Sequence, residues 1–173
     1  MVIIITGASH SGKTMLAQKL LEKYKYPYLS IDHLKMGLIR SGNTDLTVYE
    51  DDKLVDYLWP IVLEMIKTAI ENNQNLIVEG LYIPNNWKES FSSEYLKYIK
   101  FIALALSKDY IINHLDDIKS NSDIIEKRLK DDINIDELIK DNQKYIDSFK
   151  DEILIIENNY EDTINKYLEN NKY

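Results

Sequence analysis

The chain of 173 residues is long enough for one domain with a real core, and its 45% hydrophobic and 29% charged residues are typical of a globular protein. Its 29 acidic and 21 basic residues leave a net charge of −8, which disfavours general nucleic-acid binding because an acidic surface repels phosphate backbones. The absence of cysteine excludes disulfides, thiolate metal sites and a thiol nucleophile. With no basic leader and no apolar run near the ~20 residues of a membrane span, we expect a cytoplasmic protein that binds no membrane.

Short apolar strands alternate with helical segments along the chain. The predicted strands span residues 2–6, 28–31, 76–78, 98–106 and 153–156. The predicted helices span residues 13–24, 34–40, 50–71, 108–129, 135–150 and 161–168. We expect Pro60 to start a new helix or to kink the third one, because it has no N–H to donate. Strands separated by helices pair in parallel, so the pattern predicts an α/β three-layer sandwich, organised as a single domain over residues 1–173.

The segment between the first strand and the first helix fits the phosphate-binding pattern G-x-x-x-x-G-K-S/T. Its residues are Gly7, Ala8, Ser9, His10, Ser11, Gly12, Lys13 and Thr14. The two glycines allow backbone angles that turn successive N–H groups toward a phosphate, and the following helix adds its positive end. We expect Lys13 to reach the β- and γ-phosphates of a nucleotide, and the Thr14 hydroxyl to join the shell of a Mg²⁺ ion.

With this loop, the chain resembles the P-loop small-molecule and nucleotide kinases, among them adenylate, shikimate and gluconate kinases, chloramphenicol phosphotransferase and the zeta-toxin group. An acid after the second strand, an acid-Gly pair after the third and a short closing strand match the same plan. The resemblance implies a five-stranded parallel sheet of order 2-3-1-4-5, with a lid over about residues 115–132. It also implies ATP and Mg²⁺ as cofactors.

Two acids at strand ends are the candidate catalytic groups. Ligands of such sheets lie beyond the carboxyl ends of strands, where Asp32 can take the proton of an acceptor hydroxyl or hold Mg²⁺ through water. Alternatively, Asp32 is the N-cap of the next helix. The resemblance makes Glu79 a second acid, near the metal directly or through water, with Gly80 allowing a ligand to approach closely. The alternative for Glu79 is an ion pair with a lysine at the sheet edge.

Arginine is scarce, although a planar, bidentate grip on phosphate favours it: the chain has only Arg40 and Arg128. Arg40 lies beyond Asp32 on the acceptor side and is either an acceptor ligand or a surface residue. The resemblance places Arg128 in the lid, where it would contact the nucleotide and neutralise charge on the transferred phosphoryl group. Tyr82 and Trp87 are candidates to line the acceptor pocket.

The loop after the fifth strand is the expected adenine site, since the base packs there in the kinases that the chain resembles. The side-chain amides of Asn158 and Asn159 both donate and accept hydrogen bonds, so they can read an adenine edge. Tyr160 offers a stacking face. Ordinary turn and N-cap chemistry is the alternative for the two asparagines.

The sequence thus predicts an enzyme, an ATP-dependent kinase that transfers the γ-phosphoryl group to a hydroxyl of a small-molecule acceptor. One alternative is a nucleoside monophosphate kinase of the adenylate type, which two arginines disfavour. Another is a P-loop ATPase or switch. Switch GTPases need a base-reading N-K-x-D element, and the segment that begins Asn165-Lys166 has no aspartate at the fourth position. We expect the small-molecule acceptor as partner, no nucleic acid, and a monomer or homodimer.

Overall fold

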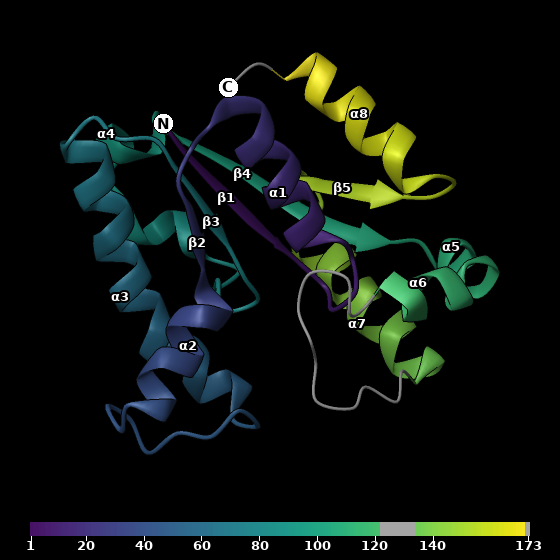
Figure 1. Ribbon diagram of the computed structural model, residues 1–173, viewed down its shortest axis with the longest axis horizontal. Coiled ribbons are helices and arrows are strands. Elements are labelled where there is room, and N and C mark those ends of the chain that lie inside the picture. The colour runs from purple at the N-terminus through teal and green to yellow at the C-terminus, as the bar shows by residue number, and fades with distance from the viewer. Residues whose placement is uncertain (122–133, 172–173) are drawn as a thin grey trace.

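A five-stranded sheet forms the centre of the computed structural model, which describes residues 1–121 and 134–171 (Figure 1). The strands are β1 (Val2–Gly7), β2 (Tyr28–Ser30), β3 (Leu76–Glu79), β4 (Ile99–Leu106) and β5 (Ile153–Ile156). All neighbouring strands are parallel, in the order β2-β3-β1-β4-β5, which confirms the predicted order 2-3-1-4-5 and the α/β fold class. The carboxyl ends of the strands therefore meet at one edge of the sheet.

Helices connect the strands and cover both faces of the sheet (Figure 1). They are α1 (Lys13–Tyr24), α2 (Ile31–Arg40), α3 (Asp51–Glu71), α4 (Ser93–Leu96), α5 (Lys108–Asn113), α6 (Leu115–Asn121), α7 (Ile135–Ser148) and α8 (Tyr160–Asn170), with one 3₁₀ turn at Trp87–Ser90. Helices α1 and α8 pack on one face, whereas α3 and the end of α7 pack on the other. This arrangement is the predicted three-layer sandwich. Within the described ranges, none of these helices combines the length and the apolar character that crossing a membrane requires.

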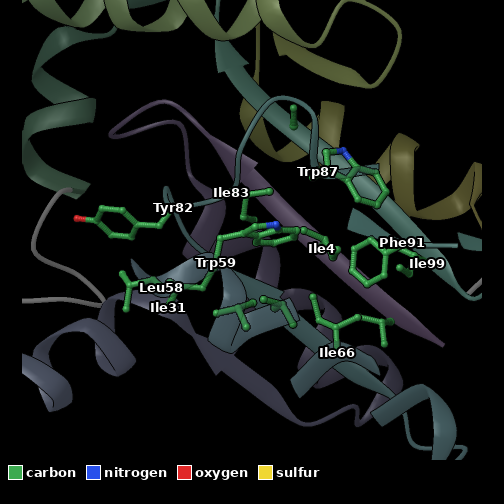
Figure 2. Packing of buried hydrophobic residues seen from close by; sticks show 14 of the residues in the cluster. Ile4, Ile31, Leu58, Trp59, Ile66, Tyr82, Ile83, Trp87, Phe91 and Ile99 are labelled. Atoms are coloured by element: carbon green, nitrogen blue, oxygen red, sulfur yellow. The ribbon is translucent and has the colours of Figure 1, made fainter. Parts of the chain in front are cut away.

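Strand β1 is buried along its whole length because its side chains alternate between two hydrophobic layers. Ile3 and Ile5 point into the layer beneath α1 and α8, and Ile4 points into the layer beneath α3. Figure 2 shows this second layer, in which Trp59 from α3 lies among aliphatic side chains. Its ring meets that of Phe91 edge to face, with centroids 6.2 Å apart.

No new helix starts at Pro60, because α3 runs through this residue as one helix of 21 residues. A proline leaves the carbonyl four residues earlier without its helical partner. Both Pro60 and Asp56, the residue four positions before it, are exposed, so water can take that hydrogen bond. The proline is therefore tolerated on the solvent side of the helix.

The prediction of one continuous helix over residues 108–129 is wrong. It divides at His114 into α5 and α6, and residues 122–133 lie outside the described part of the chain. The His114 ring stacks on that of Tyr110 with centroids 4.3 Å apart, and its Nδ1 lies 3.1 Å from the Tyr110 carbonyl oxygen. The His114 backbone N–H still donates to that carbonyl at 3.0 Å, so the helical hydrogen bonding ends just after it.

Candidate active site

The phosphate-binding loop leaves β1 at the carboxyl edge of the sheet and leads directly into α1, as its motif predicts. Gly7 and Gly12 have φ angles of +151° and +86°, a region in which L side chains are strained, and His10 follows a similar path at +61°. A Cβ on Gly7 would lie 2.2 Å from the Leu104 carbonyl oxygen of β4. The glycines are thus required for the path of the loop itself.

Lys13 begins α1 and turns back beneath the loop. It is only 6% exposed, and its Nζ donates to the Ala8 carbonyl oxygen at 2.8 Å. The Ser11 hydroxyl is buried and has no hydrogen-bond partner among the described residues. A buried ammonium group, an unsatisfied hydroxyl and the positive end of a 12-residue helix suit a bound anion. The loop therefore fits the phosphates of a nucleotide, with Thr14 one residue further along α1.

A tyrosine from near the end of the chain packs against this loop. Tyr160 is the first residue of α8, and its hydroxyl donates to the Gly12 carbonyl oxygen at 2.7 Å. Its ring lies so close that a Cβ on Gly12 would come within 2.4 Å of a ring carbon. Burial raises the pKa of Tyr160, so the hydroxyl stays protonated at neutral pH. Sequence reasoning missed this contact because 148 positions separate the partners.

Replacing Tyr160 by phenylalanine is expected to lower the free energy of unfolding by about 1 kcal/mol, the usual net value of one hydrogen bond. We also expect weaker binding of a nucleoside triphosphate, because the Gly12 carbonyl loses its tether while the ring contact remains. Thermal unfolding and calorimetric titration measure the two effects. Tyr98→Phe is the matched control, since that ring is 47% exposed. Equal affinity in Tyr160→Phe and the parent chain would contradict a role for this tether.

Asp32 is the second residue of α2, so the alternative that made it the N-cap is wrong. The cap is Ser30, whose hydroxyl accepts from the His33 backbone N–H at 3.3 Å. Strand β2 also ends at Ser30, one residue before the predicted end of the second strand. The Asp32 carboxylate, 28% exposed, instead accepts a 2.6 Å hydrogen bond from Lys35 Nζ. Burial lowers the pKa of Lys35, but hydrogen bonds to Asp32 and Tyr82 outweigh burial and raise that pKa overall.

Tyr82 joins this pair to α3. Its hydroxyl accepts from Lys35 Nζ at 2.8 Å and donates to the Asp51 carboxylate at 3.2 Å. Figure 2 shows the Tyr82 ring at the border of the hydrophobic layer, with the hydroxyl directed away from it. Asp32, Lys35, Tyr82 and Asp51 thus form a polar cluster at the carboxyl edge of the sheet, which we call the acceptor cluster. The sequence indicates Lys35 as a partner of Asp32, because the two residues are three positions apart on one helix face. No local spacing indicates Asp51 as a member of the cluster.

A second phenol lies near the acceptor cluster. Burial is the main cause that raises the pKa of Tyr145 in α7 to about 12. The negative charges of Asp141 and Asp51 raise this pKa further, whereas the nearby Thr6 hydroxyl lowers it. Thr6, the residue before the last one of β1, lies on the same face as Ile4, which points toward α3. Its hydroxyl is fully buried and makes no well-formed hydrogen bond with the described residues. This side of the sheet therefore holds buried hydroxyl groups as well as charges.

Glu79 lies on the other face of the sheet. Along β3 it shares a face with Ile77, which packs in the layer beneath α1, and it is only 2% exposed. Its carboxylate accepts a 2.8 Å hydrogen bond from the Tyr28 hydroxyl. This phenol is a partner that the sequence did not suggest. The structure thus divides the two candidate acids between faces: Glu79 on the side of the phosphate loop helix, and Asp32 in the acceptor cluster.

Two further expectations at the acceptor side are corrected. The space beside Gly80 is filled by Ile31 rather than left for a ligand, because a Cβ on Gly80 would lie 2.7 Å from the Ile31 Cβ. Trp87 is not a pocket residue but a core residue, 3% exposed, with its ring stacked on Phe101 at a centroid distance of 4.7 Å. Each residue has a packing role.

Gly80→Ala is expected to destabilise the chain by about 1–3 kcal/mol, the usual cost of overpacking, because the branched Cβ of Ile31 cannot rotate away. Urea unfolding monitored by circular dichroism measures the change. Gly37→Ala in α2 is the matched control, since nothing lies within 4 Å of an added Cβ there. The control should stabilise the helix by roughly 0.5–1 kcal/mol. Gly80→Ala with the stability of the parent would refute the close approach.

The remaining predicted residues are placed as follows. Arg40 is exposed at the last position of α2, where a cation faces the negative helix end. Asn158 is exposed in the loop after β5. Asn159 is the N-cap of α8, its side chain accepting from the Asp162 N–H at 2.9 Å, which is the capping alternative. Arg128 and most of the predicted lid lie outside the described residues.

Comparison with curated proteins shows one partial match. No protein-family model matches the chain. Over 81 residues it is 31% identical to a cytidylate kinase from Methanocorpusculum labreanum, a match that takes in 46% of this chain and 46% of that protein. The matching segment therefore spans about half the length of this relative.

Solved structures with a similar fold cover nearly the whole chain. A shikimate kinase from Bacteroides thetaiotaomicron has a TM-score of 0.56 at 16% identity, covering 98% of this chain and 97% of that one. A sugar kinase from a Janibacter species has a TM-score of 0.55 at 14% identity, covering 97% and 92%. A shikimate kinase from Aquifex aeolicus has a TM-score of 0.50 at 16% identity, covering 98% and 95%. The chain therefore has the fold of the P-loop small-molecule kinases.

Proposed function

We propose that this chain is an ATP-dependent phosphotransferase that transfers the γ-phosphoryl group to a hydroxyl of a small-molecule acceptor. The observation that carries this proposal is the shared position of two groups. The phosphate-binding loop and the acceptor cluster lie at the same carboxyl edge of one parallel sheet, on strands β1 and β2 that flank β3. In open α/β sheets this edge is where ligands bind.

The residues of the two groups suit an in-line transfer. The acceptor oxygen forms a bond to the γ-phosphorus while the bond from that phosphorus to the β–γ bridging oxygen breaks, which leaves ADP. Asp32 takes the proton of the acceptor hydroxyl as general base. Lys35, which also donates to the Tyr82 hydroxyl, holds the carboxylate of Asp32 in place. Lys13 supplies positive charge beneath the β- and γ-phosphates.

Magnesium would be held mainly by the nucleotide and Thr14. Among the residues that the structure describes, no three histidine or acidic side chains are arranged to hold a metal by themselves. A P-loop places the Ser/Thr hydroxyl on the ion, and Glu79 on the same face would act through water. A bound Mg²⁺ would supply positive charge that neutralises the charge developing on the transferred phosphoryl group.

The loop over residues 157–160 remains our proposed adenine site. It follows β5, which pairs with β4, and it reaches the phosphate loop through the contact of Tyr160 with Gly12. This contact supports the expected closeness of the two loops. Because Asn159 caps α8, the exposed Asn158 is the better candidate to read the base edge. Arg128 and closure of the lid over about residues 115–132 stay predictions.

Transfer of labelled phosphate tests the proposed function directly. The purified chain is incubated with Mg²⁺, ATP labelled at the γ-phosphorus and pools of small hydroxyl compounds, and labelled products are separated from ATP and inorganic phosphate. We expect a labelled acceptor whose formation requires Lys13. Release of inorganic phosphate alone, unchanged by any pool, would instead identify an ATPase.

A second candidate function rests on the partial match to a cytidylate kinase. It predicts transfer to a nucleoside monophosphate, for which cytidine monophosphate is the first acceptor to test. A nucleotide acceptor needs cations for its phosphate, and Lys35 is already bonded to Asp32. Labelled cytidine diphosphate as the main product would establish this candidate in place of the first.

A further inference from the structure

The acceptor cluster and its neighbours carry an excess of negative charge. The charged groups that act on Tyr82 are Lys35, Asp32 and Asp51. Those that act on Tyr145 are Asp141 and, again, Asp51. Among the described residues, three carboxylates and one ammonium group therefore act on the two phenols. Bound ATP would add further negative charge at the same edge of the sheet.

The single cation of this group is already engaged. Lys35 donates to both Asp32 and Tyr82, and its side chain is only 11% exposed. Asp51 differs from Asp32 in two ways. It is exposed, and among the described residues its carboxylate accepts a hydrogen bond from a neutral group, the Tyr82 hydroxyl. Its charge is thus open to a ligand. A carboxylate that has only a neutral partner gains more from an ammonium group than from a hydroxyl.

A separate observation supports a polar ligand here. The Thr6 hydroxyl near the end of β1 is fully buried on the face that points toward the acceptor cluster, and its contact with Tyr145 falls short of a well-formed hydrogen bond. A buried polar group whose hydrogen bond is poorly formed costs free energy, and a ligand oxygen would remove that cost. Thr6 directly precedes the phosphate loop, so this oxygen would lie close to the transferred group.

We propose that the acceptor is an alcohol that carries a protonated amine, and that Asp51 binds its ammonium group while the hydroxyl is directed toward Asp32. The inference rests on the proposed function and names its substrate class. An acidic acceptor would place a fourth negative charge beside three carboxylates and the nucleotide, with Lys35 already paired. An uncharged acceptor would leave the Asp51 carboxylate with only its neutral partner, the Tyr82 hydroxyl.

Two matched sets of alcohols test this class. Each set contains an amine, an uncharged compound and an acid of similar shape, such as glucosamine, glucose and glucuronate, or ethanolamine, ethylene glycol and glycolate. Phosphate transfer from labelled ATP is measured for each pool, and kcat/KM for every compound that is labelled. We expect transfer to the amine-bearing pool, with little or none to the acids.

The variant Asp51→Asn keeps the shape of the side chain and its acceptor for the Tyr82 hydroxyl but removes the charge. It is expected to lower kcat/KM for the amine-bearing acceptor about tenfold, the factor that about 1.4 kcal/mol represents. KM for ATP should not change. Asp52→Asn is the matched control, since it removes an equal charge from the neighbouring exposed position.

The outcomes separate the substrate class from the proposed function. Preferred transfer to acidic or uncharged alcohols overturns the amine-bearing class and leaves the kinase intact. An equal loss in Asp51→Asn and Asp52→Asn, or an equal loss for all three classes of alcohol, overturns the role of Asp51. Lack of transfer to every pool by a chain that binds ATP overturns the proposed function and this inference with it.

Discussion

Lys13→Ala is expected to abolish phosphoryl transfer, with turnover falling by at least 10²–10³-fold, about the effect of removing one preorganised electrostatic contact. The physical reason is the position of this side chain. Its Nζ is held beneath the phosphate loop by the Ala8 carbonyl, at the positive end of α1, and the residue is almost fully buried. Calorimetric titration with an ATP analogue and the transfer assay measure affinity and rate.

The fold of Lys13→Ala is expected to survive, because the side chain contributes charge to the loop more than packing to the core. Circular dichroism and thermal unfolding check this. Lys19→Ala is the matched control on the same helix. Lys19 forms a partly exposed ion pair with Glu161, worth only about 0–1 kcal/mol, and lies outside the loop. A folded Lys13→Ala chain that binds and turns over ATP like the parent would refute the phosphate-loop assignment.

Asp32→Asn is expected to slow phosphoryl transfer by about 10²–10⁴-fold, the usual cost of losing a general base, while ATP affinity changes little. The amide keeps an oxygen that can accept from Lys35, so the local structure is preserved and the effect reports the proton acceptor. Single-turnover transfer and calorimetric titration separate rate from binding. Asp151→Asn, an exposed change before β5 at the opposite edge of the sheet, is the control.

Glu79 is the acid that would replace Asp32 if this expectation fails. Transfer at the full rate in Asp32→Asn would assign Asp32 to the support of Lys35 and Tyr82, and Glu79→Gln would then carry the loss. The positions of the two acids favour Asp32 as the general base. Glu79 lies on the side of α1 and accepts a hydrogen bond from Tyr28, whereas Asp32 lies in the acceptor cluster.

Much of the architecture was predictable because it depends on local patterns. Apolar runs such as residues 2–6 and 76–78 are buried on both faces, and the helices between them impose parallel pairing. The phosphate loop was predictable because its glycines, Lys13 and Thr14 occupy fixed spacings between a strand and a helix. The boundary predictions that failed were at Pro60, which lies on an exposed helix face, and at His114, whose ring stacks on Tyr110. No periodicity records either feature.

What the sequence by itself determined is the fold class, the carboxyl edge of the sheet as the place of the candidate site, and the loop with the phosphate-binding pattern, because each follows from residues that are neighbours along the chain. What only the tertiary structure decided is the composition of the site around that loop. Tyr160 meets Gly12 across 148 positions, and Asp51 meets Tyr82 across 31. Gly80 is filled by Ile31 rather than by a ligand. These contacts arise where separate elements pack together, so their distances depend on the whole fold, and no local spacing encodes them.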